Sequence, residues 1–567
     1  MSIYVKYIAA SKNAQEKMSI VADESQAFWS SAELSAGYPD IPWATLEPQG
    51  WLLDGTRDIL PDSPDDTIGW WSKERSDDNG VVEEHPVLCL EFPAEEAFSA
   101  TGITFRFWPS TEEWCSEIYV TWYYNDEVVG ATTAFPDSGN WSLDYPVDQF
   151  NRVDIEIVAT NIPGHFAKLQ QIQIGQVIVF FQDELVRVTL LNEVDPSSCE
   201  LSADELTVEI RDSKRSKLDI RKNHQLQLYR NDEMIASHFV RDSAREGESK
   251  ITLKGHSAIA MLEDTFLGGF YDKESLPEIL SAVLGDMPYV TEISLLSKTI
   301  SGYLPACTKR AALQQIAFAA GAYVTTQGNG TIQINAVPDI FATAPVSGFG
   351  KDKVLSGSNL TQVAPPKKIQ VTAHKYTEIE EIEELAEVSV PNKSPGRQEE
   401  IICTFSEPHW GYSYVQLTSE EGGTVYKIEE HANWVRIIAD AGVALKLTGK
   451  KYGHTTLEHT WINPDISDFG GDTIKVENAT LITEDNVENA IARLKDYHTL
   501  TSSLKGTVVV NHQKAGEIVE VANPYGSDLT VGYITSMESE FTANGHTASI
   551  EVKGTARPAN EAEVLIR

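Results

Sequence analysis

Residues 304–334 form a short helix followed directly by a β-hairpin, and this segment constrains the fold more than any other. Thr308 is a suitable N-cap, and Gly321 can adopt the left-handed conformation that ends a helix. Two β-prone runs follow, joined by a turn whose Asn-Gly step suits a hairpin. The apolar residues of the helix recur at i, i+3, i+4 and i+7 and share one face: Leu313, Ile316, Ala317 and Ala320. We expect this face to be buried in the core, or to contact a subunit if it is exposed.

Tryptophan is concentrated near the N-terminus, where nine of the twelve precede residue 142. This shift in composition predicts a separate domain that ends near Phe181. Within it, the runs 102–108, 117–124, 152–160 and 168–181 are alternating or apolar and are separated by Asp, Asn, Gly and Pro clusters. That pattern is typical of an antiparallel β-sandwich.

The rest of the chain predicts two small β-barrels around an α/β insertion. Helices are expected at 257–263 and 276–284, and a further helix at 484–498 begins with Thr483 as its cap. The fold class is therefore mainly β and multidomain. We expect these domains: 1–182, a β-sandwich resembling carbohydrate-binding modules; 183–255, the first part of the first barrel; 256–345, the α/β insertion; 346–480, strands completing the barrel and insertion; 481–567, a helix and the second barrel.

The charge balance excludes some partners. Lysine and arginine total 45 against 84 aspartates and glutamates, which gives a formal charge of −39. Such a surface repels phosphates, so we expect no stable nucleic-acid binding. Lysines interrupt the first 17 residues, and no run approaches the roughly 18 apolar residues of a membrane span. We therefore expect that the chain has no membrane span and that it is synthesised in a cytosol. The five cysteines are scattered and suggest neither a disulfide framework nor a zinc site.

Several groups of polar residues could form catalytic or metal sites. His454 and His459 are five residues apart rather than in the HExxH spacing, and on a strand they would face opposite sides. Glu112 and Glu113 are adjacent, so on a strand they could hardly flank one glycosidic bond. We expect no enzymatic activity and no cofactor. Calcium is the alternative for two aspartate groups, although neither has EF-hand spacing and solvated loops are favoured: Asp54, Asp58, Asp62, Asp65 and Asp66; Asp465, Asp468 and Asp472.

Three further segments have two interpretations. Trp70 and Trp71 are adjacent, so one of them could be exposed and stack on a sugar ring, although core packing is favoured for each tryptophan. The acidic run 378–384 is expected to be a solvated face or a mobile loop. Residues 348–351 complete neither a dinucleotide fingerprint nor a phosphate loop, and are expected to be a flexible loop.

Several passages of the chain resemble tail hub or baseplate hub proteins of phages and of phage-like injection particles of Gram-positive bacteria. These passages are the opening unit 304–334 and the following: WATLEPQGWLLDG (43–55), IGWWSKERSDDNG (68–80), LLNEVDPSSCELSADELTVEIRD (190–212), AMLEDTFLGGFYD (260–272) and the closing 516–541. The chain departs from a minimal hub by its N-terminal sandwich, and we expect no C-terminal peptidase or lysozyme-like extension.

The resemblance implies a structural protein of the virion or particle tail tip. Two similar barrels per subunit would form a homotrimeric ring of six barrels around the ejection channel. The implied partners are the distal tail or tail tube protein, the tape measure protein and a spike or central fibre. An acidic lumen would keep DNA from adhering during ejection. The alternative functions are a peripheral tail protein that binds host cell-surface glycan and, less favoured, a glycan-cleaving protein.

Overall fold

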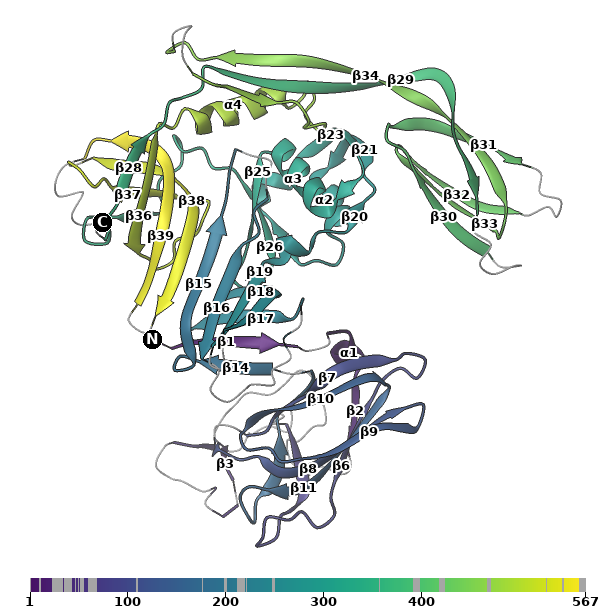
Figure 1. Ribbon diagram of the computed structural model, residues 1–567, viewed down its shortest axis with the longest axis vertical. Coiled ribbons are helices and arrows are strands. Elements are labelled where there is room, and N and C mark those ends of the chain that lie inside the picture. The colour runs from purple at the N-terminus through teal and green to yellow at the C-terminus, as the bar shows by residue number, and fades with distance from the viewer. Residues whose placement is uncertain are drawn as a thin grey trace. The chain divides into compact units, whose positions relative to one another are not determined.

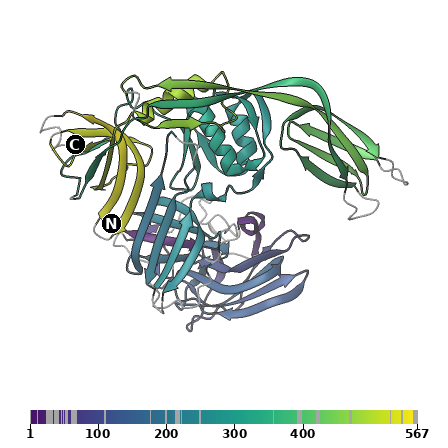
Figure 2. The same ribbon diagram turned by 45° about the horizontal axis from the view of Figure 1, so that its top comes forward.

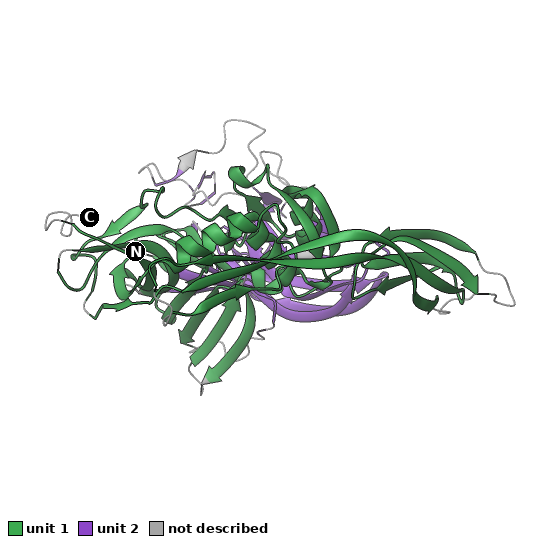
Figure 3. Ribbon diagram, turned by 90° about the horizontal axis from the view of Figure 1, so that it is seen from above, with its two compact units in different colours: residues 1–3, 182–216, 228–567 green, residues 4–181, 217–227 purple. Residues whose placement is uncertain are grey.

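The computed structural model describes residues 2–9, 12–22, 34, 43–45, 47–48, 50, 56–59, 69–108, 111–175, 177–197, 201–211, 220, 222–246, 250–355, 357–390, 398–417, 424–466, 471–526, 528–542 and 545–559. Strands make up 59% of the structure and helices 9%, which confirms the prediction of a mainly β protein. The chain forms two compact units (Figure 3), one of residues 4–181 with 217–227, and one of residues 1–3, 182–216 and 228–567. We call them the sandwich unit and the body unit. Among the described residues, no helix is both long and apolar enough to cross a membrane.

The sandwich unit contains two main antiparallel sheets, in the orders β2-β6-β11-β8-β9 and β10-β7-β13. Alternating residues of β11 point inward because strand side chains alternate between faces, and they join the apolar core of the unit. The elements are β1 (Ile3–Ile8), α1 (Lys12–Lys17), β2 (Ser19–Ala22), β3 (Trp43–Ala44), β4 (Asp58–Ile59), β5 (Trp70–Arg75), β6 (Val87–Glu91), β7 (Phe98–Arg106), β8 (Cys115–Tyr124), β9 (Glu127–Ala134), β10 (Asn140–Phe150), β11 (Arg152–Thr160), β12 (Phe166–Leu169), β13 (Gln171–Ile174) and β14 (Val177–Phe181).

The body unit is built on a sheet in which strands from its beginning and its end are neighbours (Figure 1), in the order β18-β19-β16-β15-β38-β39-β36-β28. The first half of β38 also pairs with β37, which in turn pairs with β27. The strands are β15 (Leu185–Glu193), β16 (Glu205–Arg211), β17 (Gln225–Arg230), β18 (Glu233–Glu246), β19 (Lys250–His256), β27 (Ser347–Phe349), β28 (Asn359–Gln362), β36 (Ser502–Val509), β37 (Ile518–Ala522), β38 (Leu529–Thr542) and β39 (Gly545–Arg557).

An α/β segment lies between these two groups of strands along the chain. Its helices pack on small sheets, of which the largest has the order β22-β26-β25. A 3₁₀ turn at Ala258–Met261 replaces the helix expected at 257–263, whereas the helix at 276–284 is present. The elements are β20 (Thr265–Phe266), β21 (Gly269–Ser275), α2 (Leu276–Leu284), β22 (Tyr289–Thr291), a 3₁₀ turn at Ile293–Leu295, β23 (Thr299–Leu304), β24 (Cys307–Thr308), α3 (Lys309–Ala320), β25 (Ala322–Thr326) and β26 (Ile332–Ala336).

Two long antiparallel strands, β29 and β34, form a ribbon within the body unit (Figure 2). One end of the ribbon pairs with β35 and packs on α4. At the other end β31 pairs with β34, and the separate sheet β30-β33-β32 packs against the ribbon. Of the described strands between residues 346 and 480, β27 and β28 join the main sheet. The elements are β29 (Lys368–Ser389), β30 (Gln398–Thr404), β31 (His409–Leu417), β32 (Val425–His431), β33 (Trp434–Asp440), β34 (Ala444–Ile462), β35 (Thr473–Val476) and α4 (Val487–His498).

Helix α4 begins three residues later than the sequence suggested. Its N-cap position is Asn486, and the Thr483 side chain makes no capping bond. Instead the backbone N–H of Thr483 donates to Oδ1 of Asn486 at 2.8 Å. The prediction of Thr483 as the cap was therefore wrong, because Glu484 and Asp485 form a turn before the helix starts.

Candidate functional site

Trp70 and Trp71 are both buried, with 0% and 5% of their surface exposed. Trp70 lies in the main core of the sandwich unit. Trp71 packs edge-on against Trp108 at 5.5 Å between ring centroids, and it also contacts Phe166. The expectation that one of the two tryptophans could be exposed is therefore wrong, whereas core packing, the favoured interpretation, is right. Side chains alternate between the two sides of β5, and each side faces a buried cluster, so neither ring is open to a sugar.

A buried cluster of charges lies beside Trp71. The Lys168 ammonium is 4.7 Å from the centroid of the Trp71 ring and forms ion pairs with Glu47, at 2.5 Å, and with Glu113. His165 completes the cluster through a 3.1 Å contact between its Nδ1 and Oε2 of Glu113. All four residues are buried.

The carboxylate oxygens of this cluster all have partners. Oε1 of Glu47 accepts the backbone N–H of Phe166 at 2.7 Å, and Oε1 of Glu113 accepts the hydroxyl of Thr111 at 2.8 Å. Buried charges are tolerated only when they are paired and hydrogen-bonded in this way. The cluster therefore ties Glu47, Glu113 and His165 to Lys168 of β12.

The cluster balances its own charge. Burial alone would raise the pKa of Glu113, but the hydrogen bond with His165 and the charge of Lys168 outweigh it and lower the pKa to about 2. Burial would likewise lower the pKa of His165, but Glu113 and Glu47 outweigh it and raise the pKa. Two carboxylates thus face two cationic groups when the imidazole is protonated.

Glu47, Glu113 and His165 are the one group of three metal-ligating side chains in the described ranges whose ligand atoms lie within 4.8 Å of one another. The ammonium of Lys168 bonds to both carboxylates and so fills the position that a metal cation would take. We interpret the cluster as a structural one. Asp54, Asp62, Asp65, Asp66 and Asp468, weighed above for calcium, lie outside the described residues.

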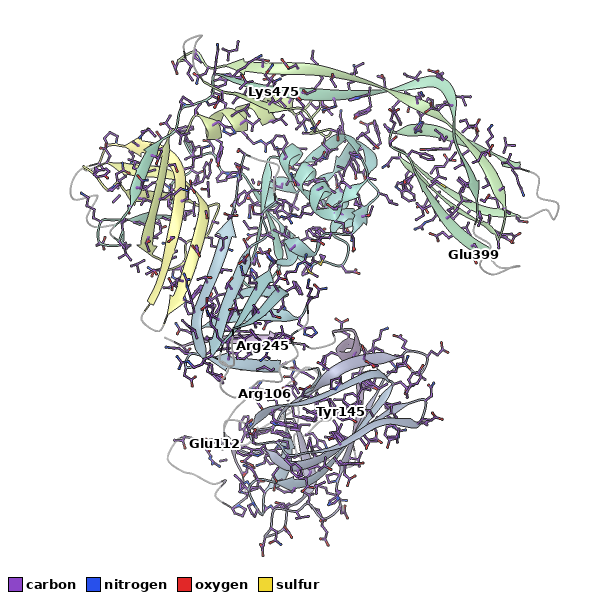
Figure 4. All side chains as sticks on the ribbon, viewed as in Figure 1. Arg106, Glu112, Tyr145, Arg245, Glu399 and Lys475 are labelled. Carbon is purple, nitrogen blue, oxygen red and sulfur yellow. The ribbon has the colours of Figure 1, made fainter. Side chains whose placement is uncertain are left out.

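Glu112 and Glu113 have different surroundings. Glu112 is exposed (Figure 4) and has a positive φ of 55°, whereas Glu113 is one of the buried cluster residues. The two carboxylates therefore do not share one cleft, and the sequence argument against a glycosidase pair agrees with this geometry.

The insertion helix α3 follows the sequence prediction closely. The Thr308 hydroxyl accepts the N–H of Ala311, and Gly321 ends the helix with φ of 79°. Leu313, Ile316 and Ala317 lie in a core shared with α2 and the β25–β26 hairpin, and Ala320 is half-buried against it. The face identified from sequence thus packs within the chain.

The two histidines weighed as a metal pair lie on β34 and bond to different groups. His454 stacks on Tyr376 at 4.5 Å and contacts His374 at 3.0 Å between ring nitrogens. His459 contacts Glu488 at 3.0 Å. The two imidazoles therefore do not converge on one ligand position.

The acidic run 378–384 is part of β29, not a loop. Its acids face lysines across the ribbon: Glu383 pairs with Lys451 and Glu384 with Lys446, each at 2.5 Å. The interpretation as a mobile loop is wrong because the run is part of a strand. The interpretation as a solvated face is right, and lysines of β34 compensate the negative charge of this face. In the segment 348–351, Gly348 and Phe349 belong to strand β27, so the prediction of a loop was wrong for these two residues, whereas Gly350 and Lys351 lie outside the strand.

The feature that best defines the body unit is the seam between β15 and β38. The strands pair in antiparallel register from Val188 with Phe541 to Glu193 with Ser536. In the same unit, Nη1 of Arg230 on β17 donates to Nδ1 of His546 on β39 at 2.8 Å. Burial of this histidine, together with the charge of Arg230, lowers its pKa to about 4, which keeps the ring neutral as an acceptor. Sequence reasoning found these strands but could not find their pairing.

Comparison with known proteins gives structural similarities only. No family model and no curated protein matches the sequence. A 43 kDa tail protein of prophage MuSo2 from Shewanella oneidensis is 12% identical, with a TM-score of 0.40, over 66% of this chain and 95% of that one. Prophage tail protein gp18 from Listeria monocytogenes is 8% identical, with a TM-score of 0.37, over 68% and 94%.

A third similar structure is the Escherichia coli protein c3393, a type VI secretion component described as similar to the tail proteins gp27 and gp5 of phage T4. It is 8% identical, with a TM-score of 0.28, over 66% of this chain and 74% of that one. Each of these three matches covers about two thirds of this chain.

Proposed function

We propose that the chain is a structural subunit of a tail-tip or baseplate hub, and that three copies form a ring around the ejection channel. The observation that carries the proposal is the seam between β15 and β38. It joins the first and last strands of the body unit into one sheet, while the α/β insertion and the ribbon are placed between them in sequence. Two adjoining β-modules per subunit are what a threefold ring that matches a sixfold tube requires.

The charge balance supports the same role. A channel that passes DNA works best when its wall repels phosphate, and the chain carries a formal charge of −39. In this proposal one face of the ring docks the distal tail or tail tube protein and the other a spike or central fibre. The tape measure protein and then DNA pass through the lumen.

We assign the sandwich unit a bracing role at the periphery. Its two candidate sugar-stacking residues, Trp70 and Trp71, are buried, and its buried charges are paired with one another. Neither feature offers an open site for glycan binding or cleavage. The protein is accordingly proposed to be a non-enzymatic part of the particle tail tip.

The test is the stoichiometry of the full-length protein. Sedimentation velocity at micromolar concentration should give a species of three chains of 62.7 kDa each, and averaged images of the assembled tail should show threefold density at the tip. A stable monomer in solution together with tail images that lack threefold density would overturn the proposal.

A further inference from the structure

A cavity of about 470 Å³ in the body unit is lined by strands β21 and β23, the ribbon strands β29 and β34 and the turn before α4. Figure 1 labels these strands and α4. Its volume is in the range of pockets that hold small ligands. Packing at this junction is tight, since a Cβ on Gly302 of β23 would lie 2.8 Å from the carbonyl oxygen of Thr480. The cavity is therefore bounded by elements that contact one another closely.

One wall of the cavity is aromatic. Phe270 stacks on Tyr452 at 4.7 Å with an interplanar angle of 15°, and Tyr376 lies edge-on to Phe270 at 6.1 Å. His454 stacks on the Tyr376 ring and fixes its orientation. Aromatic faces attract cations through the negative potential of the ring, and rings held in place lose little freedom on binding.

The rim of the cavity is acidic. Asp272, Glu378, Glu484 and Asp485 line it and are exposed, against one lysine, Lys375. Acids before a helix favour its dipole, which accounts for Glu484 and Asp485. Asp272 and Glu378 lie on β21 and β29, where no helix terminus explains them, and neither forms an ion pair with a described residue.

The arrangement of the rim acids bears on the class of ligand. The rim carboxylates are not among the side chains whose ligand atoms converge within 4.8 Å in the described ranges. Carboxylates that lie apart from one another beside aromatic rings suit an extended organic cation better than a single metal ion.

We propose that this cavity binds an organic cation, either a guanidinium or an alkylammonium group. The rings of Tyr452 and Phe270 contact its apolar and cationic parts, and the carboxylates of Asp272 and Glu378 pair with its charge. The group comes either from an arginine or lysine side chain of a partner protein or from a free polyamine. This inference does not depend on the trimeric hub.

Isothermal titration of the full-length protein tests the proposal with three probes. A short glycine-serine peptide carrying one arginine represents the partner side chain, spermidine represents the free polyamine, and the same peptide with citrulline is the uncharged control. We expect the arginine peptide or spermidine to bind and the citrulline peptide to bind at least about tenfold more weakly, because it lacks the charge. The better cationic probe identifies the source.

Substitutions locate the binding. Glu378→Gln and Asp272→Asn should each weaken binding by about fivefold to tenfold, and Tyr452→Leu should weaken it similarly by removing the ring. Glu387→Gln is the matched control, since it makes the same charge change at an exposed position of β29 outside the cavity and should leave binding unchanged. Thermal unfolding of each variant distinguishes loss of binding from loss of fold. Equal binding of the arginine and citrulline peptides, binding unaffected by Glu378→Gln, or no binding of either cation at millimolar concentration would overturn the proposal.

Discussion

The Lys168 ammonium lies 2.5 Å from Oε2 of Glu47 inside the sandwich unit, with both side chains at most 1% exposed. Two charges at that depth are stable only as a pair, because each alone would lose its hydration without compensation. The pair joins positions 121 residues apart, and so it fixes Glu47 against β12. The aromatic cluster of Trp71 and Trp108 packs next to it.

Replacing the lysine should therefore destabilise the sandwich unit strongly. Lys168→Met leaves Glu47 without its nearest cation and Glu113 with only His165, and we expect a loss of about 3–5 kcal/mol in the free energy of unfolding. Tryptophan fluorescence during urea unfolding of the full chain reports this unit, since nine of the twelve tryptophans lie in it. Lys17→Met is the control: Lys17 also pairs with a glutamate at 2.5 Å, but the pair is exposed and should contribute less than about 1 kcal/mol. Similar losses for both variants would contradict the structural role of the cluster.

The close approach of the β25–β26 turn to β18 predicts that a larger residue in this turn lowers stability. A Cβ on Gly328 would lie 2.5 Å from the carbonyl oxygen of Met234 and 3.0 Å from that of Ile235, both on β18. Gly328→Ala should therefore push the hairpin off the sheet and cost about 1–3 kcal/mol, the usual cost of overpacking. Gly269→Ala is the matched control, because its Cβ would meet only the Tyr271 ring at 3.5 Å. Urea unfolding followed by far-ultraviolet circular dichroism measures the difference, and unchanged stability of Gly328→Ala would refute the close approach.

Local signals explain which parts of the fold the sequence predicted. The helix and hairpin of 304–334 were predicted almost to the residue, because the Thr308 cap and the Gly321 stop depend on near neighbours. The ribbon was missed because its acids find their lysines in a strand about 70 residues away, as for Glu380 and Lys450. The buried cluster was missed since charged residues normally predict exposure. One feature of the sequence could have indicated that Lys168 is buried, because this lysine begins an alternating apolar run.

The seam between β15 and β38 predicts a loss of assembly as well as of stability. Thr189 is paired on both sides, with Thr207 of β16 and Glu540 of β38. Thr189→Pro removes an amide donor from a central strand and should cost about 3 kcal/mol or more. Thr189→Val keeps the strand and should have little effect. If the seam holds two ring-forming modules together, sedimentation should show the trimer for Thr189→Val and its loss for Thr189→Pro. A trimer that persists in a folded Thr189→Pro variant would show that the ring does not need the seam.

Stability of the body unit should fall in mild acid because of His238. This histidine is 3% exposed, and neither ring nitrogen has a hydrogen-bond partner in the part of the chain that the structure describes. Burial lowers its pKa to about 4, from an ordinary value of 6.5. The unfolded chain therefore binds the proton first, so stability is lost as the pH falls below about 6.5 and continues to fall until about pH 4. His238 alone should contribute about 2 kcal/mol to the loss between pH 7 and pH 5. Burial also lowers the pKa of His498 and of His546 to about 4, so these two groups add to the loss.

Replacing His238 separates its contribution to the acid loss of stability from the opposite contribution of Asp204. Burial raises the pKa of Asp204 to about 6, so that carboxyl binds its proton first in the folded state and adds stability as the pH falls through 6. His238→Leu keeps Asp204 and removes only the histidine, so urea unfolding of the variant at pH 7 and pH 5 should show a smaller acid loss than the parent protein. A pH dependence identical in the two proteins would mean that His238 gains a proton as easily in the folded state as in the unfolded one, because only a difference in proton affinity between the two states makes stability depend on pH.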